Sequence, residues 1–302
     1  MKKKVQLAQQ EPDHNMLTAA EIKKLQQAIG IFLWYGRITD PTMLFTLNTL
    51  VSAQSKGTEE TKAAMEHFLD YCATHPEATI RFYASDMILK IHSDASYLSE
   101  PEAKSRAGGY FYLGNKDDSM KNNGAIHIIA KIIKNVVSSA AEAEIAAIFM
   151  CAKEAVPIRQ TLIEMDHPQP ATEIVTDNAA ATAILNKSCK QVRSKAIDMN
   201  YYWVRDRIAQ KQFNLIWRAG VENLADYFTK HHSPAHHKRM RPIYLYCIKE
   251  HLANMVKSEN LRGCVAKFTN KASTKSPLKI TKSDAKRLVR RVLVKLNYGA
   301  KR

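Results

Sequence analysis

Four acidic residues stand at or near the ends of predicted secondary-structure elements: Asp94, Glu144, Asp177 and Asp226. Asp94 and Asp177 each close a run typical of a strand, Glu144 lies early in an Ala-rich helix, and Asp226 begins a short helix. Carboxylates that converge from separate elements can hold two Mg²⁺ ions about 3.5–4 Å apart, an arrangement that hydrolyses phosphodiester bonds. Because Mg²⁺ prefers oxygen ligands and keeps several waters, a few acids suffice.

Each acid also has an ordinary structural explanation. Asp94 could be a turn residue after its strand, and Asp177-Asn178 could cap the next helix. Asp226 could satisfy the N-terminus and dipole of its own helix. Glu142 competes with Glu144, because residues two apart on a helix point about 200° away from each other and only one can face a site. Both have apolar neighbours four residues on, so periodicity leaves the choice open.

The elements that must position these acids change type along the chain. Residues 79–97 alternate and are rich in Ile, Phe and Tyr, which predicts strands. Gly108-Gly109 and Asn122-Asn123-Gly124 are hairpin signals, so three antiparallel strands are expected. The pattern then predicts a helix over 139–165, a strand over 173–176, a helix after Asn178, a helix over 194–210, a strand over 213–217 and a short helix from about 223. This order predicts a mixed sheet with helices on its faces.

A small helical unit is expected before the sheet. Thr18 and Glu21 form a capping box, Asp40-Pro41 opens a second helix, and Thr58 opens a third that Pro76 ends. Together with the residues that follow, these three helices define a predicted helical segment over 17–85.

The basic residues are concentrated at the end of the chain. The chain of 302 residues has a net charge of +16, and residues 231–302 hold 18 Lys and Arg against three acids, whereas the first 230 hold 27 against 26. Such asymmetry favours a polyanionic partner, most often nucleic acid, over a merely solubilising tail. The 45% hydrophobic content excludes disorder of the whole chain. The longest apolar run is eight residues, which predicts no membrane span and no membrane partner.

Other groups that could bind metals or bases are given structural interpretations. The five cysteines are scattered without a C-x-x-C pair, which argues against disulfides and a zinc knuckle. His231-His232 and His236-His237 lack nearby cysteines or acids at ligand spacing, so a polar, phosphate-facing turn is favoured over zinc. Trp203, Trp217 and Tyr201-Tyr202 fall among apolar positions and are predicted to be core residues.

Five motifs carry a family resemblance over about 155 residues: SDASY at 93–97, SSAAEAEIAA at 138–147, TDN at 176–178, RSKAIDMNYYWVRD at 193–206 and NLADYFTK at 223–230. With them the chain resembles the ribonuclease H domain of copia-type LTR-retrotransposon Pol polyproteins. Residues 17–85, including 58–76, resemble the segment that links reverse transcriptase to ribonuclease H.

The resemblance implies a ribonuclease H-like fold, a five-stranded mixed sheet flanked by helices, with an N-terminal helical segment. It implies a four-carboxylate metal and catalytic site at Asp94, Glu144, Asp177 and Asp226, and its pattern of an acid followed by apolar-x-Ala favours Glu144 over Glu142. The chain departs from the family pattern in four respects. The polymerase pair Y-x-D-D is absent, and the loop before the last acid lacks the His of cellular ribonucleases H. Ala196 stands where many copia-type sequences have His, and Pro157 interrupts a usually continuous helix.

The function implied is a metal-dependent endonuclease that cleaves the RNA strand of RNA–DNA hybrids, with two Mg²⁺ ions as cofactors and Mn²⁺ as a substitute. Backbone contacts to the hybrid are expected from Lys104, Arg106, Arg193 and Lys195. The implied partners are the hybrid, other nucleic acid and a reverse transcriptase domain of the same polyprotein. The alternative is a catalytically inactive nucleic-acid-binding remnant of a retroelement.

The predicted organisation is a flexible N-terminus over 1–16, the helical segment over 17–85, a ribonuclease H-like domain over 86–248 and a basic tail over 249–302. Residues 284–296 are the part of that tail that could form a helix. An intracellular location is expected, in the cytoplasm or the nucleus, or in virus-like particles.

Overall fold

The computed structural model describes residues 16–117, 122–186 and 198–246. The predicted flexible N-terminus (except Met16), the predicted contacts Arg193 and Lys195, and the basic tail all lie outside the described residues.

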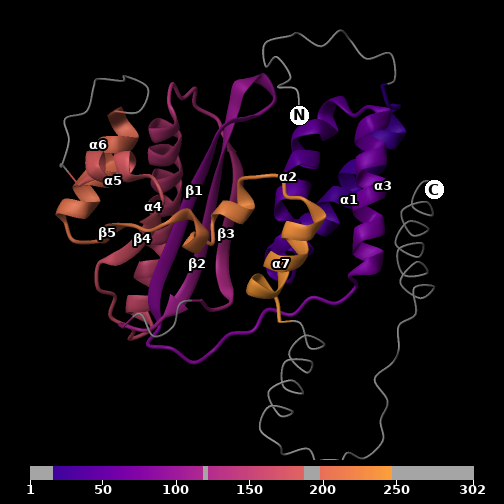
Figure 1. Cartoon of the computed structure of the whole chain (residues 1–302). Helices are drawn as coiled ribbons and strands as arrows, with labels where there is room; N and C mark the ends of the chain where they lie inside the picture. Colours follow the sequence, from indigo (N-terminus) through magenta and orange to yellow (C-terminus); the bar gives the residue numbers. More distant parts are fainter. Residues whose placement is uncertain (1–15, 118–121, 187–197, 247–302) are drawn as a thin grey trace, which may run out of the picture.

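Three helices form the N-terminal unit: α1 (Ala19–Ile38), α2 (Leu44–Ala53) and α3 (Glu59–Thr74), with short 3₁₀ turns η1 (Pro41–Met43) and η2 (Gln54–Lys56). The expected starts are confirmed. Thr18 and Glu21 make the capping box of α1, Asp40 caps η1 immediately before α2, and Thr58 caps α3. These helices share their own core, which includes Leu25, Leu47 and Phe68, and they stand beside the sheet (Figure 1).

A five-stranded sheet forms the centre of the described structure, in the order β3-β2-β1-β4-β5. Its strands are β1 (Ile88–Glu100), β2 (Lys104–Gly114), β3 (Ala125–Ile133), β4 (Thr172–Thr176) and β5 (Phe213–Trp217). β1, β2 and β3 pair antiparallel, whereas β4 lies parallel to both β1 and β5. The predicted fold class, a mixed sheet with flanking helices and an N-terminal helical segment, is confirmed.

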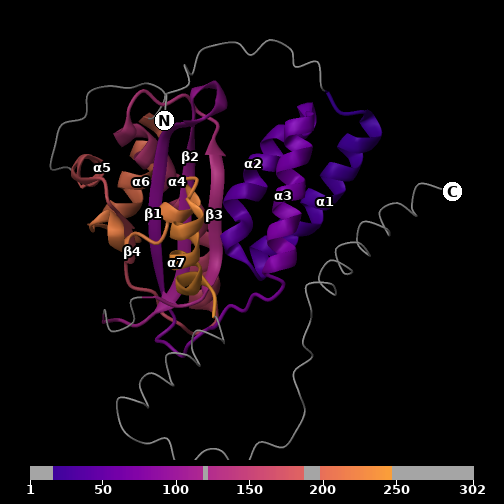
Figure 2. The same ribbon diagram turned by 45° about the vertical axis from the view of Figure 1, so that its right-hand side comes forward.

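The two faces of the sheet are covered differently (Figures 1 and 2). One face packs on α4 (Ala140–Glu164), α5 (Ala179–Leu185) and α6 (Asp198–Ala209), with Ile91, Phe111 and Ile174 in the shared core. The other face meets η5 (Asp226–Phe228) and α7 (Pro234–Tyr244) through an aromatic cluster that includes Tyr110. Among the described residues, no helix combines the length and apolar character needed to cross a membrane.

The start of the first strand differs from the expectation. Residues 79–87 form no strand, and β1 begins only at Ile88. Asn123 explains this, because its side chain accepts the Tyr83 N–H at 2.9 Å and donates to the Tyr83 carbonyl at 3.1 Å. A side chain thus satisfies backbone groups that a neighbouring strand would otherwise pair.

Gly108 and Gly109 do not form the predicted hairpin turn. They lie inside β2, and the turn between β1 and β2 is the 3₁₀ turn η3 (Pro101–Ala103). A Cβ on Gly108 would stand 2.7 Å from the carbonyl oxygen of Ala225, and one on Gly109 would stand 2.8 Å from Cys151 Sγ. The two glycines therefore allow close approach on both faces of the strand.

The last part of the described chain was predicted least well. The expected short helix near residue 223 is instead a pair of 3₁₀ turns, η4 (Gly220–Glu222) and η5. Helix α7 was not predicted, although Ser233-Pro234 is a regular helix start and Ser233 caps it. His236 and His237 lie in this helix, so the predicted phosphate-facing turn is wrong there. His237 hydrogen-bonds the hydroxyls of Tyr71 and Tyr227.

Candidate active site

Asp94, Glu144 and Asp177 are brought together at one end of the sheet. Each offers a carboxylate oxygen within 4.8 Å of the others, and no other group of three or more acids, histidines or cysteines in the described residues meets this geometry. The histidines considered for zinc are not part of it. All three acids were predicted from the sequence.

Asp94 lies in β1, and its side chain is only 2% exposed. Its carboxylate accepts a hydrogen bond from the Thr229 hydroxyl. Burial raises the pKa of Asp94 to about 6, although the Thr229 hydrogen bond and the Lys230 charge lower it. The ordinary interpretation of Asp94 as a turn residue is wrong, because the strand continues to Glu100.

Glu144 projects from the first turns of α4 onto the ends of β1 and β4. Its carboxylate accepts the backbone N–H of Ala95 at 3.1 Å and the Thr176 hydroxyl at 3.2 Å. Burial, together with the charges of Asp94 and Asp177, raises the pKa of Glu144 to about 9. A carboxyl whose pKa is raised this far needs a nearby positive charge before it and its two neighbours can all be ionised.

Glu142 has a different environment. Its carboxylate accepts the backbone N–H and the hydroxyl of Ser138, each at 2.7 Å, while its own N–H donates to Ser139 Oγ. These contacts hold the N-terminus of α4. The structure therefore places Glu144, and not Glu142, in the acidic cluster.

Asp177 follows directly on β4, and of the pair Asp177-Asn178 that could cap the next helix, Asn178 is the residue that does so. The Asn178 side chain caps α5 by accepting the Ala181 N–H at 2.9 Å, which leaves the Asp177 carboxylate for the cluster. Gly220 packs against that carboxylate, since a Cβ there would lie 2.7 Å from Asp177 Oδ2.

Asp226 lies at the edge of the site rather than in the three-acid group. It begins η5, and its carboxylate forms an ion pair with Lys230. The negative charge of Asp226 raises the pKa of Asp94, so the two carboxylates are close enough to repel each other. Burial lowers the pKa of Lys230, but its hydrogen bond with Asp226 and the charges of Asp94, Asp226 and Asp177 raise it overall.

The predicted nucleic-acid contact at Arg106 is wrong. Its side chain is fully buried; Nε donates to Glu100 at 2.7 Å, and the guanidinium also donates to Thr49 and covers the Phe45 ring. Arg106 therefore ties β2 to α2, and its burial leaves it no access to a phosphate. Lys104 is exposed and pairs with Glu102 at 2.6 Å, so its contact with the hybrid stays a prediction.

Two aromatic residues predicted to be core are on the surface. Tyr202 is 63% exposed, and Trp217 is 52% exposed at the end of β5. Trp217 was misjudged because it continues the buried alternation of Phe213 and Leu215. Its indole N–H instead donates to the Asp177 carbonyl at 2.9 Å, beside the acidic cluster.

The donor set fits a hard divalent cation. It consists of carboxylate oxygens without a thiol or imidazole, and two of the acids are held where burial opposes their negative charge. Mg²⁺ and Mn²⁺ bind such ligands and supply the missing positive charge.

We expect the free energy of unfolding, measured in EDTA, to reveal the cost of placing these carboxylates close together. A carboxyl whose folded pKa is raised holds its proton longer in the folded state, so the free energy of unfolding falls as the pH rises from about 4.5 to about 9 for Glu144. Glu144→Gln should remove this contribution. Urea unfolding at pH 5 and pH 8 should show the variant gaining stability relative to the wild type at pH 8; parallel behaviour would contradict the assigned burial.

Comparisons with known proteins find sequences similar to this chain among retrovirus-related Pol polyproteins. The chain is 25% identical over 203 residues to a retrovirus-related Pol polyprotein from transposon TNT 1-94 of Nicotiana tabacum, which covers 67% of this chain and 15% of that protein. It is 26% identical over 205 residues to the corresponding polyprotein from transposon RE2 of Arabidopsis thaliana, covering 66% and 13%. The chain thus spans about one seventh of the length of these curated relatives. No family model matches it.

Solved structures with a similar arrangement are ribonucleases H. One is LC11-RNase H1, isolated from compost by a metagenomic approach, with 13% identity, a TM-score of 0.37, and coverage of 47% of this chain and 93% of that one. Another is RNase H1 from Halobacterium salinarum, with 14% identity, a TM-score of 0.31, and coverage of 47% and 94%. The sequence homologues of the chain are retrovirus-related Pol polyproteins of plant transposons, as the motifs predict.

Proposed function

We propose that the chain is the ribonuclease H part of a retrotransposon Pol polyprotein and hydrolyses the RNA strand of RNA–DNA hybrids with two Mg²⁺ ions. The observation that carries this proposal is the convergence of Asp94, Glu144 and Asp177 within 4.8 Å at the end of the sheet. The homology to Pol polyproteins supports the substrate class.

Each carboxylate has a separate part in the proposed site. Asp94 and Asp177 would anchor the ions, because Asp94 lies within β1 and Asp177 directly follows the neighbouring parallel strand β4. Glu144 would hold one ion and orient the attacking water, and Asp226 would complete the second position once Lys230 releases it. When bound, the ions generate the hydroxide and neutralise charge on the phosphorane.

The protein also controls the state of these acids before any ion binds. Thr229 fixes one oxygen of Asp94, and Ala95 with Thr176 fixes both oxygens of Glu144. The carboxylates are thereby preorganised, so little reorientation is needed when positive charge enters the site. Discrimination of the hybrid should rest on its shape, phosphates and 2′-hydroxyls.

The partners follow from the same proposal. The remaining six sevenths of the relatives' length would include the reverse transcriptase domain that supplies the hybrid, and this domain is the proposed protein partner. The predicted intracellular location and the electrostatic role of the basic tail stay predictions.

The experiment that tests the function compares substrates and metals with the full chain. With Mg²⁺, the RNA strand of a labelled hybrid should be cut, whereas single-stranded RNA, duplex RNA and duplex DNA should remain intact. EDTA should stop the reaction, and Ca²⁺ should allow hybrid binding with little cleavage because its looser coordination positions water poorly. Binding without cleavage under Mg²⁺ would favour the inactive remnant instead.

A further inference from the structure

The segment that carries Asp226 has little structure of its own. Between the end of β5 at Trp217 and the start of α7 at Pro234, all residues are described, and the only regular elements are the three-residue turns η4 and η5. Two such turns cannot fix a carboxylate by themselves, since they make few internal hydrogen bonds. The position of Asp226 therefore depends on what the segment is attached to.

The attachment is to three consecutive residues of β1. Two residues before Asp226, Leu224 donates its backbone N–H to His92 Nδ1 at 3.0 Å. The neighbouring Asn223 donates its side-chain amide to the Ser93 carbonyl at 2.9 Å. The contacts from residues 223 and 224 fix the approach to Asp226 from the N-terminal side.

The third contact lies after Asp226. Thr229 donates its hydroxyl to the carboxylate of Asp94. Gly108 leaves room for this whole arrangement, because a Cβ there would stand 2.7 Å from both the Ala225 carbonyl and the Thr229 methyl group. Strand β1 therefore holds both sides of the turn on which Asp226 stands.

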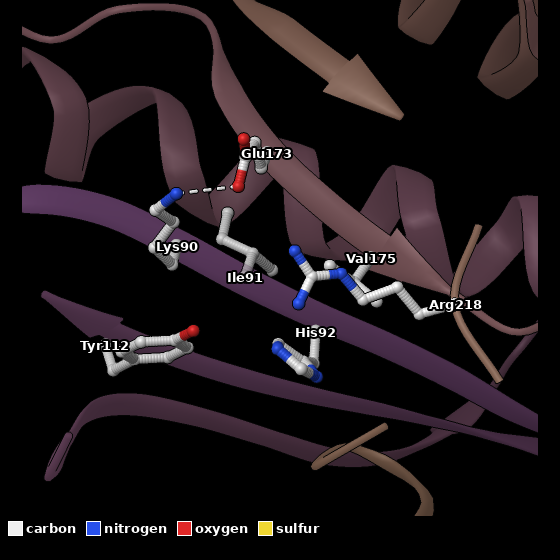
Figure 3. A pocket seen from close by; sticks show the side chains of 7 residues that line it. All are labelled: Lys90, Ile91, His92, Tyr112, Glu173, Val175 and Arg218. Atoms are coloured by element: carbon white, nitrogen blue, oxygen red, sulfur yellow. Dashed lines mark hydrogen bonds and ion pairs between the residues drawn. The ribbon is translucent and has the colours of Figure 1, made fainter. Parts of the chain in front are cut away.

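His92 is the only one of the β1 anchors that acts through a side chain without being an acid of the proposed site. Its ring is 4% exposed and forms part of the wall of a polar hollow that is also lined by Lys90, Tyr112, Glu173, Val175 and Arg218 (Figure 3). Because Nδ1 accepts the Leu224 N–H, the ring proton belongs on Nε2. This tautomer gives His92 a directional contact with the segment that carries Asp226.

We propose that His92 is a positioning residue that, by accepting the Leu224 N–H, holds the Asn223–Thr229 segment so that Asp226 can complete the metal site. His92 does not belong to the acidic cluster; it acts through Leu224. The first effect that we infer is a change in the affinity for Mg²⁺. Only the effect on catalysis rests on the proposed function.

The test compares His92→Leu, which removes the acceptor, with His92→Asn, whose side-chain oxygen can replace Nδ1. Mg²⁺ affinity is measured from the rise of the melting temperature with Mg²⁺ concentration in full-length protein. Loss of a partner that orients a ligand costs about 10–100-fold in metal affinity, so His92→Leu should weaken Mg²⁺ binding by about that factor. His92→Asn should restore it to near the wild-type value.

Two further variants make the outcome specific. In an Asp226→Asn background, His92→Leu should weaken Mg²⁺ binding no further, because both changes act on the same ligand. Lys90→Gln alters the same strand and hollow, where Lys90 pairs with Glu173, and should leave Mg²⁺ affinity unchanged. If His92→Leu fails to fold, His92→Gln takes its place, because its acceptor lies nearer the Nε2 position than the Nδ1 position.

Unchanged Mg²⁺ affinity in His92→Leu, or an equal loss in His92→Asn, would overturn the inference. An additive loss in the Asp226→Asn background would overturn it as well. Failure of the proposed function would look different, since the wild type would then bind Mg²⁺ in the melting experiment and leave the hybrid uncut.

Discussion

Asp94→Asn is expected to abolish cleavage of the hybrid while the fold and hybrid binding persist. The carboxylate of Asp94 is buried between Glu144 and Asp177, and the amide that replaces it cannot supply negative charge to an ion. Because the ions contribute several kcal/mol of transition-state stabilisation, turnover should fall by about 10³-fold or more.

The same variant should also change the metal-free protein in a defined direction. Burial raises the pKa of Asp94 to about 6, so at pH 8 the ionised carboxylate is held against its preference, and the neutral amide should stabilise the fold in EDTA. Single-turnover cleavage, hybrid affinity in Ca²⁺ and the melting temperature measure the three consequences. Undiminished hydrolysis in Asp94→Asn would contradict the assignment of the site.

Glu144→Gln and Glu142→Gln should give opposite results although the residues are two apart on one helix. Glu144→Gln removes a carboxylate from the cluster and should inactivate the enzyme, again by about 10³-fold or more. Glu142→Gln weakens the contacts with Ser138 at the N-terminus of α4, so it should cost at most about 0.5–2 kcal/mol of stability and leave the rate nearly unchanged.

Cleavage rates and urea unfolding of both variants, measured side by side, separate these effects. Each variant serves as the matched control for the other, because both replace one Glu by Gln in the same turn. An inactive Glu142→Gln with an active Glu144→Gln would require the opposite face of α4 to point at the sheet.

Several site residues could be predicted from the chain because local signals were strong. Asp94 and Asp177 follow β-rich runs, and parallel strands leave their carboxyl ends at one edge of the sheet. The helix caps Thr18, Asp40 and Thr58 could also be predicted from the sequence, since a side-chain oxygen at a helix start acts within its own turn.

Contacts between segments far apart in the chain could not be predicted in the same way. Gly108 looked like a turn residue, yet its role is to admit the Ala225 carbonyl 117 positions later in the chain. Arg106 looked like a phosphate contact, yet Glu100 and the Phe45 ring bury it. Neither position carries a local pattern that distinguishes these roles, because the partner residues are set by packing.

By itself, the sequence determined the order of the strands and of the helices as far as β5, the candidate acids and the basic tail, since these depend on residue type and short-range periodicity. The tertiary structure decided which of Glu142 and Glu144 enters the site, because the Ala95 N–H and the Thr176 hydroxyl come from two other elements. It also decided that Asp226 stands apart with Lys230 on a turn held by His92. The hydrogen bonds of Glu144 and His92 join separate elements that lie 32 to 132 residues apart in the chain, which no local pattern encodes.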